Sequence, residues 1–169
     1  MTKKIADLLD EIGLFQEFSY AELEVLARYL KLEEIIAGEM VFSEGERGNY
    51  MFILLSGKVA IFKGGMRHQH LLATEGRGRI IGEMSLLDQE ARSASCVAEQ
   101  NSEILTFTHQ SLKRMAVEHP AVAFHFMLFL ARLLSRRLRR TSGMVAEYMS
   151  ELEELYQRAE PGQEESSEE

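Results

Sequence analysis

The sequence is short of cysteine, of long apolar runs and of basic charge. Its single cysteine, Cys96, excludes an internal disulfide framework and is typical of a reducing compartment. The longest apolar run, residues 121–134, is too short to span a bilayer and contains His125 and Arg132. Only 19 lysines and arginines stand against 27 aspartates and glutamates, and this net charge of −8 argues against general affinity for nucleic acid. We therefore expect a cytoplasmic protein that binds neither membranes nor DNA.

The 169 residues, 46% of them hydrophobic, suffice for one domain with a real core and an added helical extension. Ser19 and Glu22 have the spacing of a capping box and predict a helix start in the N-terminal segment. Short β-rich runs with glycine turns follow from Ile35 onwards and predict a sandwich or barrel. The expected organisation is a β-roll with N-terminal helices over 1–120, a long helix over 121–159 and a disordered acidic tail over 160–169.

The long C-terminal helix carries an apolar seam with alternating spacings of four and three residues. A heptad seam of this length predicts pairing with an identical helix, so we expect a homodimer through residues 127–155. The alternative, that this face lies on the sandwich, suits the part before Leu134, where the helix is apolar nearly all round. The seam consists of Met127, Ala131, Leu134, Leu138, Thr141, Val145, Tyr148, Leu152 and Leu155.

Arg92 is a lone arginine that follows an acidic turn and is surrounded by small residues in a predicted strand. A half-buried guanidinium there needs a counter-charge, because an unpaired buried charge costs several kcal/mol. The counter-charge is either a carboxylate of the protein or a bound anion. The candidate carboxylates are Glu83, Asp88 and Glu90.

Three blocks, in this order and spacing, resemble the cyclic nucleotide-binding domain family, of the cyclic-AMP receptor protein type. FSEGERGNYMFILLSGKVAIF (42–62) resembles the family's first hairpin, and IIGEMSLLDQEARSA (80–94) resembles its phosphate-binding cassette. RRLRRTSGMV (136–145) resembles the helical segment that covers the nucleotide base. The resemblance implies a mainly β fold with flanking helices: a double-stranded β-helix, or jelly-roll-like β-roll, with N-terminal helices and a long C-terminal dimerisation helix.

The resemblance also implies a ligand, cyclic AMP, and a role for each matching residue. Gly82 would let the backbone turn, Glu83 would bind the ribose 2′-hydroxyl, and Arg92 would pair with the cyclic phosphate. The free N–H groups of a helix start over Met84–Leu87, together with Ser93, would bind the same phosphate. The full set of implied binding residues is Gly82, Glu83, Met84, Ser85, Arg92, Ser93, Thr141 and Ser142, of which the last two would reach the purine. Cyclic GMP is the alternative ligand, and Ser93, where a threonine would favour guanine, leans towards cyclic AMP.

The sequence thus predicts a stand-alone, dimeric regulatory protein that senses a cyclic nucleotide and acts on an unidentified downstream protein. We expect no catalytic activity, no metal and no winged helix-turn-helix domain. Two alternatives stay open. The first is a dimeric scaffold of the same fold with a vestigial cassette. The second is a cupin-like metalloenzyme that would use His68, His70 and Glu75.

Overall fold

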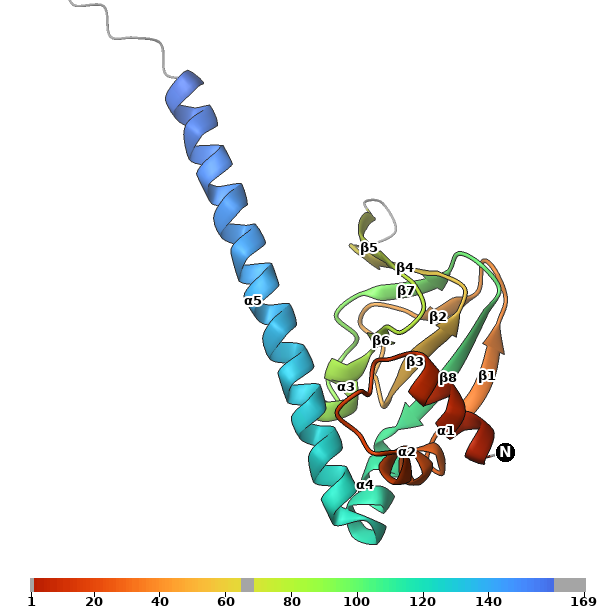
Figure 1. Ribbon diagram of the computed structural model, residues 1–169. Coiled ribbons are helices and arrows are strands. Elements are labelled where there is room, and N and C mark those ends of the chain that lie inside the picture. The colour runs from red at the N-terminus through yellow and green to blue at the C-terminus, as the bar shows by residue number, and fades with distance from the viewer. Residues whose placement is uncertain (1, 65–68, 160–169) are drawn as a thin grey trace, which may run out of the picture. The chain divides into compact units, whose positions relative to one another are not determined.

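The computed structural model describes residues 2–64 and 69–159, which form five helices and eight strands (Figure 1). The helices are α1 (Thr2–Glu11), α2 (Tyr20–Ala27), α3 (Glu83–Asp88), α4 (His109–Glu118) and α5 (Pro120–Ala159). The strands are β1 (Lys31–Ile35), β2 (Met40–Phe42), β3 (Tyr50–Ser56), β4 (Val59–Lys63), β5 (His70–Glu75), β6 (Ile80–Ile81), β7 (Ser95–Ala98) and β8 (Ser102–Thr108).

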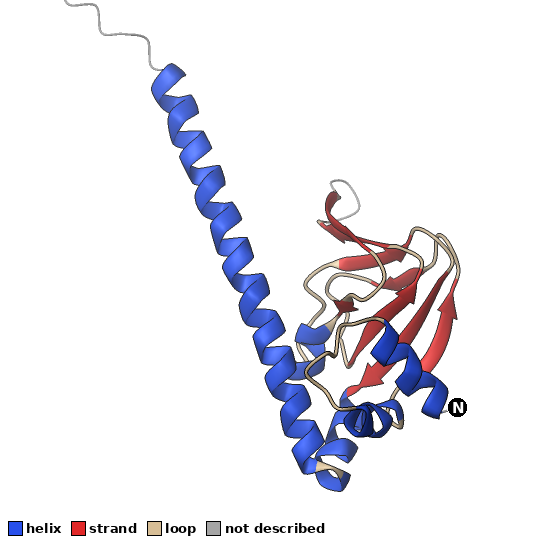
Figure 2. Cartoon of the chain, viewed as in Figure 1, coloured by secondary structure: helices blue, strands red, loops and turns tan. Residues whose placement is uncertain are grey.

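The strands form two antiparallel sheets of four, in the orders β1-β8-β3-β6 and β2-β7-β4-β5 (Figure 2). Consecutive strands alternate between the sheets in several places, so the chain winds back and forth across the core as it does in a β-roll. The fold class expected from the sequence, a β-roll with N-terminal helices and a long C-terminal helix, is confirmed.

The core is built around β3, the apolar run YMFILLS, which pairs with both β6 and β8. Phe52 and Leu54 lie in the cluster between the sheets, together with Cys96 of β7. The alternate side chains Met51 and Ile53 are fully buried as well. A strand covered on both faces has no need of alternating polar residues, which explains its continuous apolar sequence.

Helix α2 starts at the predicted cap. The Ser19 hydroxyl accepts from the Glu22 amide and the Glu22 carboxylate accepts from the Ser19 amide, so the capping box of α2 is present. The second carboxylate oxygen of Glu22 accepts from His125 Nδ1 of α5 at 2.8 Å, and the His125 ring stacks on Phe18. One carboxylate therefore connects the start of α2 with the first turns of α5.

The chain divides into two compact units, with the boundary between Phe126 and Met127 inside α5. Within the first unit, Phe126 packs against Phe107 of β8, with ring centroids 5.2 Å apart. The second unit is the remainder of α5, which continues as one unbroken helix to Ala159. No helix in the described part of the chain has the length and apolarity that a bilayer crossing requires.

Candidate functional site

The segment from Gly82 to Arg92 turns sharply from β6 into the short helix α3. Gly82 is the N-cap of α3 and has a left-handed backbone with φ of 83°, a conformation that favours glycine. Glu83 and Ser85 on the first turn are buried, whereas Met84 between them is half exposed. The first turn of α3 thus places two polar side chains in buried positions, and their role as ligand-binding groups stays a prediction.

The sequence predicted a strand at Arg92. In the structure this residue lies in the loop before β7, which begins at Ser95. Its backbone is nevertheless paired, because its amide donates to the Glu46 carbonyl and its carbonyl accepts from Gly45. The side chain is only 3% exposed. Nη1 donates to the Gly82 carbonyl at 3.2 Å, which joins the two ends of the cassette directly.

No ion pair neutralises Arg92 within the described residues, and its Nη2 is buried without a hydrogen-bond partner. The predicted alternative of a salt bridge to Glu83, Asp88 or Glu90 is therefore wrong for this structure; Asp88 instead accepts from the Glu90 amide. Burial lowers the pKa of the guanidinium, while nearby Tyr50 and Glu46 oppose that shift. An arginine keeps its proton at physiological pH, so Arg92 carries a buried positive charge that no carboxylate in the described part of the chain neutralises.

Two aromatic rings hold the guanidinium. Its central carbon lies 4.2 Å from the centroid of Phe42 and 4.5 Å from that of Tyr50. Both contacts are cation–π interactions, which compensate part of the lost hydration. Neither ring was a candidate site residue in the sequence, because only the folded β2 and β3 bring them to Arg92.

Gly48 is a further residue that sequence reasoning missed, having been counted among the turn glycines. A Cβ atom at this position would lie 2.2 Å from Ser85 Cβ and 2.9 Å from Arg92 Nε. Such distances are far inside van der Waals contact, so the absence of a side chain at Gly48 is what lets α3 and Arg92 approach the loop before β3. The only signal in the sequence is its place in the block 42–62.

The remaining predicted residues are on the surface. Ser93 is exposed, and its carbonyl accepts from Lys63 Nζ at 2.8 Å. Thr141 and Ser142 are exposed residues of α5 in the second unit. The Thr141 hydroxyl donates to the Arg137 carbonyl one turn earlier at 3.0 Å, a local use of the oxygen within the helix. The purine-binding role assigned to these two residues stays a prediction.

The cupin-like alternative involves His68, which lies outside the described residues. His70 and Glu75 stand at opposite ends of β5, about 16 Å apart at the usual rise of a strand, and the Glu75 carboxylate pairs with Arg79 at 3.0 Å. These two side chains are therefore not brought together. In the described parts of the chain, no group of three or more histidine, cysteine, aspartate or glutamate side chains is arranged to hold a metal ion.

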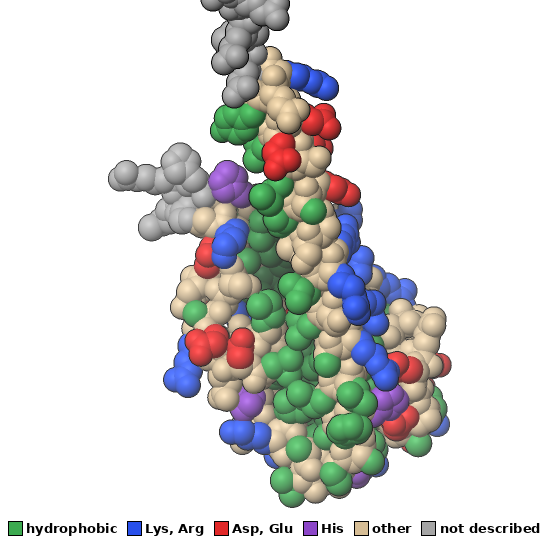
Figure 3. Space-filling view, turned by 90° about the vertical axis from the view of Figure 1, so that its left-hand side faces the viewer, with side chains coloured by type: hydrophobic (Ala, Val, Ile, Leu, Met, Phe, Trp, Pro, Cys, Tyr) green, Lys and Arg blue, Asp and Glu red, His purple; other side chains and the backbone are tan. Residues whose placement is uncertain are grey.

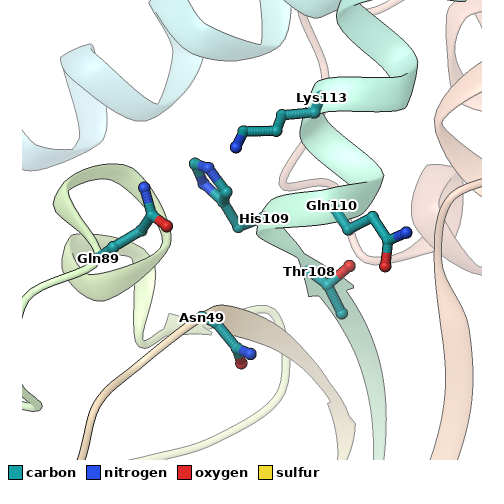
Figure 4. Close-up of a pocket in the computed structure, with 6 residues that line it drawn as sticks. All are labelled: Asn49, Gln89, Thr108, His109, Gln110 and Lys113. Carbon is teal, nitrogen blue, oxygen red and sulfur yellow. The ribbon is translucent and has the colours of Figure 1, made fainter.

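A polar cavity of about 350 Å³ opens where α3 ends and α4 begins (Figure 4). His109 Nδ1 donates to the Leu86 carbonyl of α3 at 3.0 Å, which ties the two helices together there. The lining residues are Asn49, Gln89, Thr108, His109, Gln110 and Lys113. None of the predicted site residues is in this set. The cavity is therefore distinct from the Arg92 cradle, by which we mean the rings of Phe42 and Tyr50 around the guanidinium.

Comparison with known proteins identifies the family. The model of the cyclic nucleotide-binding domain matches residues 32–119, from β1 through α4, and this range includes the cassette and the Arg92 cradle. The chain belongs to the cyclic nucleotide-binding domain family. Its β-roll is thus that of a cyclic nucleotide-binding domain, as the resemblance predicted.

Individual relatives agree with this assignment. The chain is 35% identical over 127 residues to a cyclic AMP receptor protein of Thermus thermophilus, covering 75% of this chain and 57% of the relative. It is 29% identical to a CRP-like cAMP-activated global transcriptional regulator of Mycobacterium tuberculosis, covering 83% of this chain and 62% of the relative. Its fold matches a cyclic nucleotide-binding domain from Methylobacillus flagellatus with a TM-score of 0.75 and 28% identity, over 87% of this chain and 83% of that one. The cyclic nucleotide-binding domain described here thus spans less than two thirds of the first two relatives.

Proposed function

We propose that this chain is a regulatory protein that binds cyclic AMP in the β-roll, with Arg92 as the partner of the cyclic phosphate. The observation that carries the proposal is a buried guanidinium that pairs with no carboxylate among the described residues, because a bound anion supplies the missing counter-charge. A phosphodiester matches two nitrogens of the planar guanidinium. Glu83 is buried in the adjacent turn and is assigned to the ribose 2′-hydroxyl.

Cyclic AMP is proposed in preference to cyclic GMP on two grounds. Two of the relatives carry cyclic AMP in their names, and Ser93 stands where a threonine would favour guanine. We propose binding without chemical change of the nucleotide. The Arg92 guanidinium contacts the rings of Phe42 and Tyr50 and the Gly82 carbonyl, and because a guanidinium keeps its proton it serves to bind an anion rather than to act as a general base.

The binding test is a calorimetric titration of the full chain with cyclic AMP and, separately, cyclic GMP. Loss of a buried charge-assisted pair costs about 2–5 kcal/mol, so Arg92→Ala is expected to weaken binding by at least about 30-fold. Arg47→Ala is the matched control, since Arg47 is exposed and its backbone pairs with that of Ala91, the neighbour of Arg92 in the cassette. Equal affinity of the two variants would remove Arg92 from the site. Chromatography of the recovered nucleotide checks that it is unchanged.

We also propose that two copies pair through the heptad seam of α5. In a single chain the seam is uncovered: Leu138 is 68% exposed, Tyr148 65% and Leu152 53%. Figure 3 shows apolar side chains following the length of this helix. A row of exposed apolar residues on one helix face is stabilised by burial against a second helix.

Sedimentation equilibrium tests the pairing. The intact chain is expected to sediment as a dimer and Leu152→Glu as a weaker dimer or a monomer, since like charges would meet in the seam. Glu153→Lys on the flank serves as the control for a charge change outside the seam. A monomer at high concentration for the unaltered chain would contradict this part of the proposal.

A further inference from the structure

The aromatic cradle of Arg92 is assembled from both sheets. Phe42 ends β2 in one sheet and Tyr50 begins β3 in the other, and their ring centroids are 6.5 Å apart at an interplanar angle of 76°. The Tyr50 hydroxyl donates to the Val41 carbonyl at 2.9 Å, which fixes the orientation of the Tyr50 ring. The guanidinium lies against both rings, so two nearly perpendicular aromatic faces hold it.

This arrangement leaves the guanidinium inaccessible to a ligand. A phosphate oxygen has to approach a guanidinium nitrogen to about 2.8 Å to form a charge-assisted hydrogen bond. Arg92 is 3% exposed, Nη2 is buried, and Nη1 already donates one hydrogen bond to the Gly82 carbonyl. A state that binds phosphate must therefore expose more of Arg92 than the structure does, and reaching that state weakens contacts with the rings.

We propose that Phe42 and Tyr50 are positioning residues that hold Arg92 in a withdrawn position and thereby set the affinity of the phosphate site. The inference rests on the proposed cyclic nucleotide function. If the binding-competent form is a minor population, the apparent affinity is reduced by its fraction. Removal of one aromatic face raises that fraction, so loss of the Tyr50 ring strengthens binding even though Tyr50 lies beside the ligand's main partner.

The withdrawn position is tested first without any ligand. Phenylglyoxal, which modifies accessible arginine, is added to the ligand-free full chain, and mass spectrometry of the digest follows Arg92, with exposed Arg47 as an internal reference. Tyr50→Leu is expected to raise the modification rate of Arg92 by about three- to tenfold, in keeping with the loss of one cation–π contact. Tyr50→Phe keeps the ring but loses the hydroxyl's bond to the Val41 carbonyl, so its Arg92 rate is expected to rise less than that of Tyr50→Leu. Equal Arg92 rates in the Leu and Phe variants would overturn the proposal.

The second arm measures the affinity of the same variants for cyclic AMP and cyclic GMP. Tyr50→Leu is expected to bind about three- to tenfold more tightly than Tyr50→Phe. Weaker or equal binding would overturn the affinity-setting role, because a ring that merely supports the ligand-binding geometry gives the opposite sign. In an Arg92→Lys background the effect of Tyr50→Leu is expected to shrink, since an ammonium lacks the planar face that stacks on a ring.

The two arms separate the possible failures. If neither nucleotide binds to the unaltered chain, the proposed function fails, while the phenylglyoxal rates still decide whether the rings withdraw Arg92. Circular dichroism checks that each variant is folded. Phe42→Leu, which removes the other ring, replaces Tyr50→Leu if that variant does not fold, with the same expected results.

Discussion

Replacement of Gly48 by alanine should displace α3 from the Arg92 loop. The added Cβ would lie 2.2 Å from Ser85 Cβ, 2.7 Å from Ser85 Oγ and 2.9 Å from Arg92 Nε. Carbon atoms pack at about 3.5–4 Å, so α3 or the loop has to move by more than about 1 Å, and Ser85 Cβ cannot rotate away because it is fixed to the backbone. Overpacking of this kind costs about 1–3 kcal/mol. For a chain of this size the corresponding fall in Tm is roughly 3–10 °C.

Differential scanning calorimetry measures this effect against Gly76→Ala. A Cβ at Gly76 meets nothing within 4 Å, and the position carries no left-handed backbone, so that variant controls for the glycine-to-alanine change itself. Its Tm is expected to stay the same or rise slightly. If Gly48→Ala unfolds within about 1 °C of Gly76→Ala, the close packing of Gly48, Ser85 and Arg92 described above is refuted. A folded Gly48→Ala variant is also expected to bind cyclic nucleotide more weakly.

Two further predictions concern titrating groups. His125, and then the amide and hydroxyl of Ser19, lower the pKa of Glu22 below its ordinary value of 4.5, so its stabilising contribution is present above that pH and is lost as the pH falls through the lowered value. The Tm values of the unaltered chain and of Glu22→Gln should therefore converge as the pH falls below about 4.5. A difference in Tm that does not change with pH would contradict the link between α2 and α5. Burial raises the pKa of Cys96 to about 12, so iodoacetamide at about pH 8 should label this thiol only after denaturant is added. Labelling of the native protein at the denatured rate would show that the core around β7 is open.

The sequence predicted the order of elements and the sharp turn at Gly82 well, because local signals determine them. Capping residues, glycine turns and the apolar run of β3 act over a few residues, and each agrees with the structure. The need of Arg92 for a counter-charge also followed from its small neighbours. What surrounds Arg92 did not follow, because Phe42 and Tyr50 are far from it in the chain. They meet it only after β2 has paired with β7 in one sheet and β3 has taken its place in the other.

Other parts of the site show the same limit. In the sequence Gly48 could not be told from a turn glycine. A glycine is needed there because α3, which is distant in the chain, packs against it. Arg92 itself was assigned to a strand on its apolar surroundings, whereas the ladder of β7 begins only at Ser95. Thr141 was selected because it is a polar residue in an apolar seam. In the structure its hydroxyl donates to the Arg137 carbonyl of the same helix, a bond that the heptad spacing does not predict.

The single 40-residue helix α5 has a mechanical consequence. At 1.5 Å per residue it is about 60 Å long, so a small change of direction at one end of the helix corresponds to a large displacement at the other. A tilt of about 10° at its root sweeps the far tip through about 10 Å, enough to carry a side chain from one neighbour to the next. A small change in the direction of α5 near Pro120 would therefore displace the helix near Ala159 by about a nanometre.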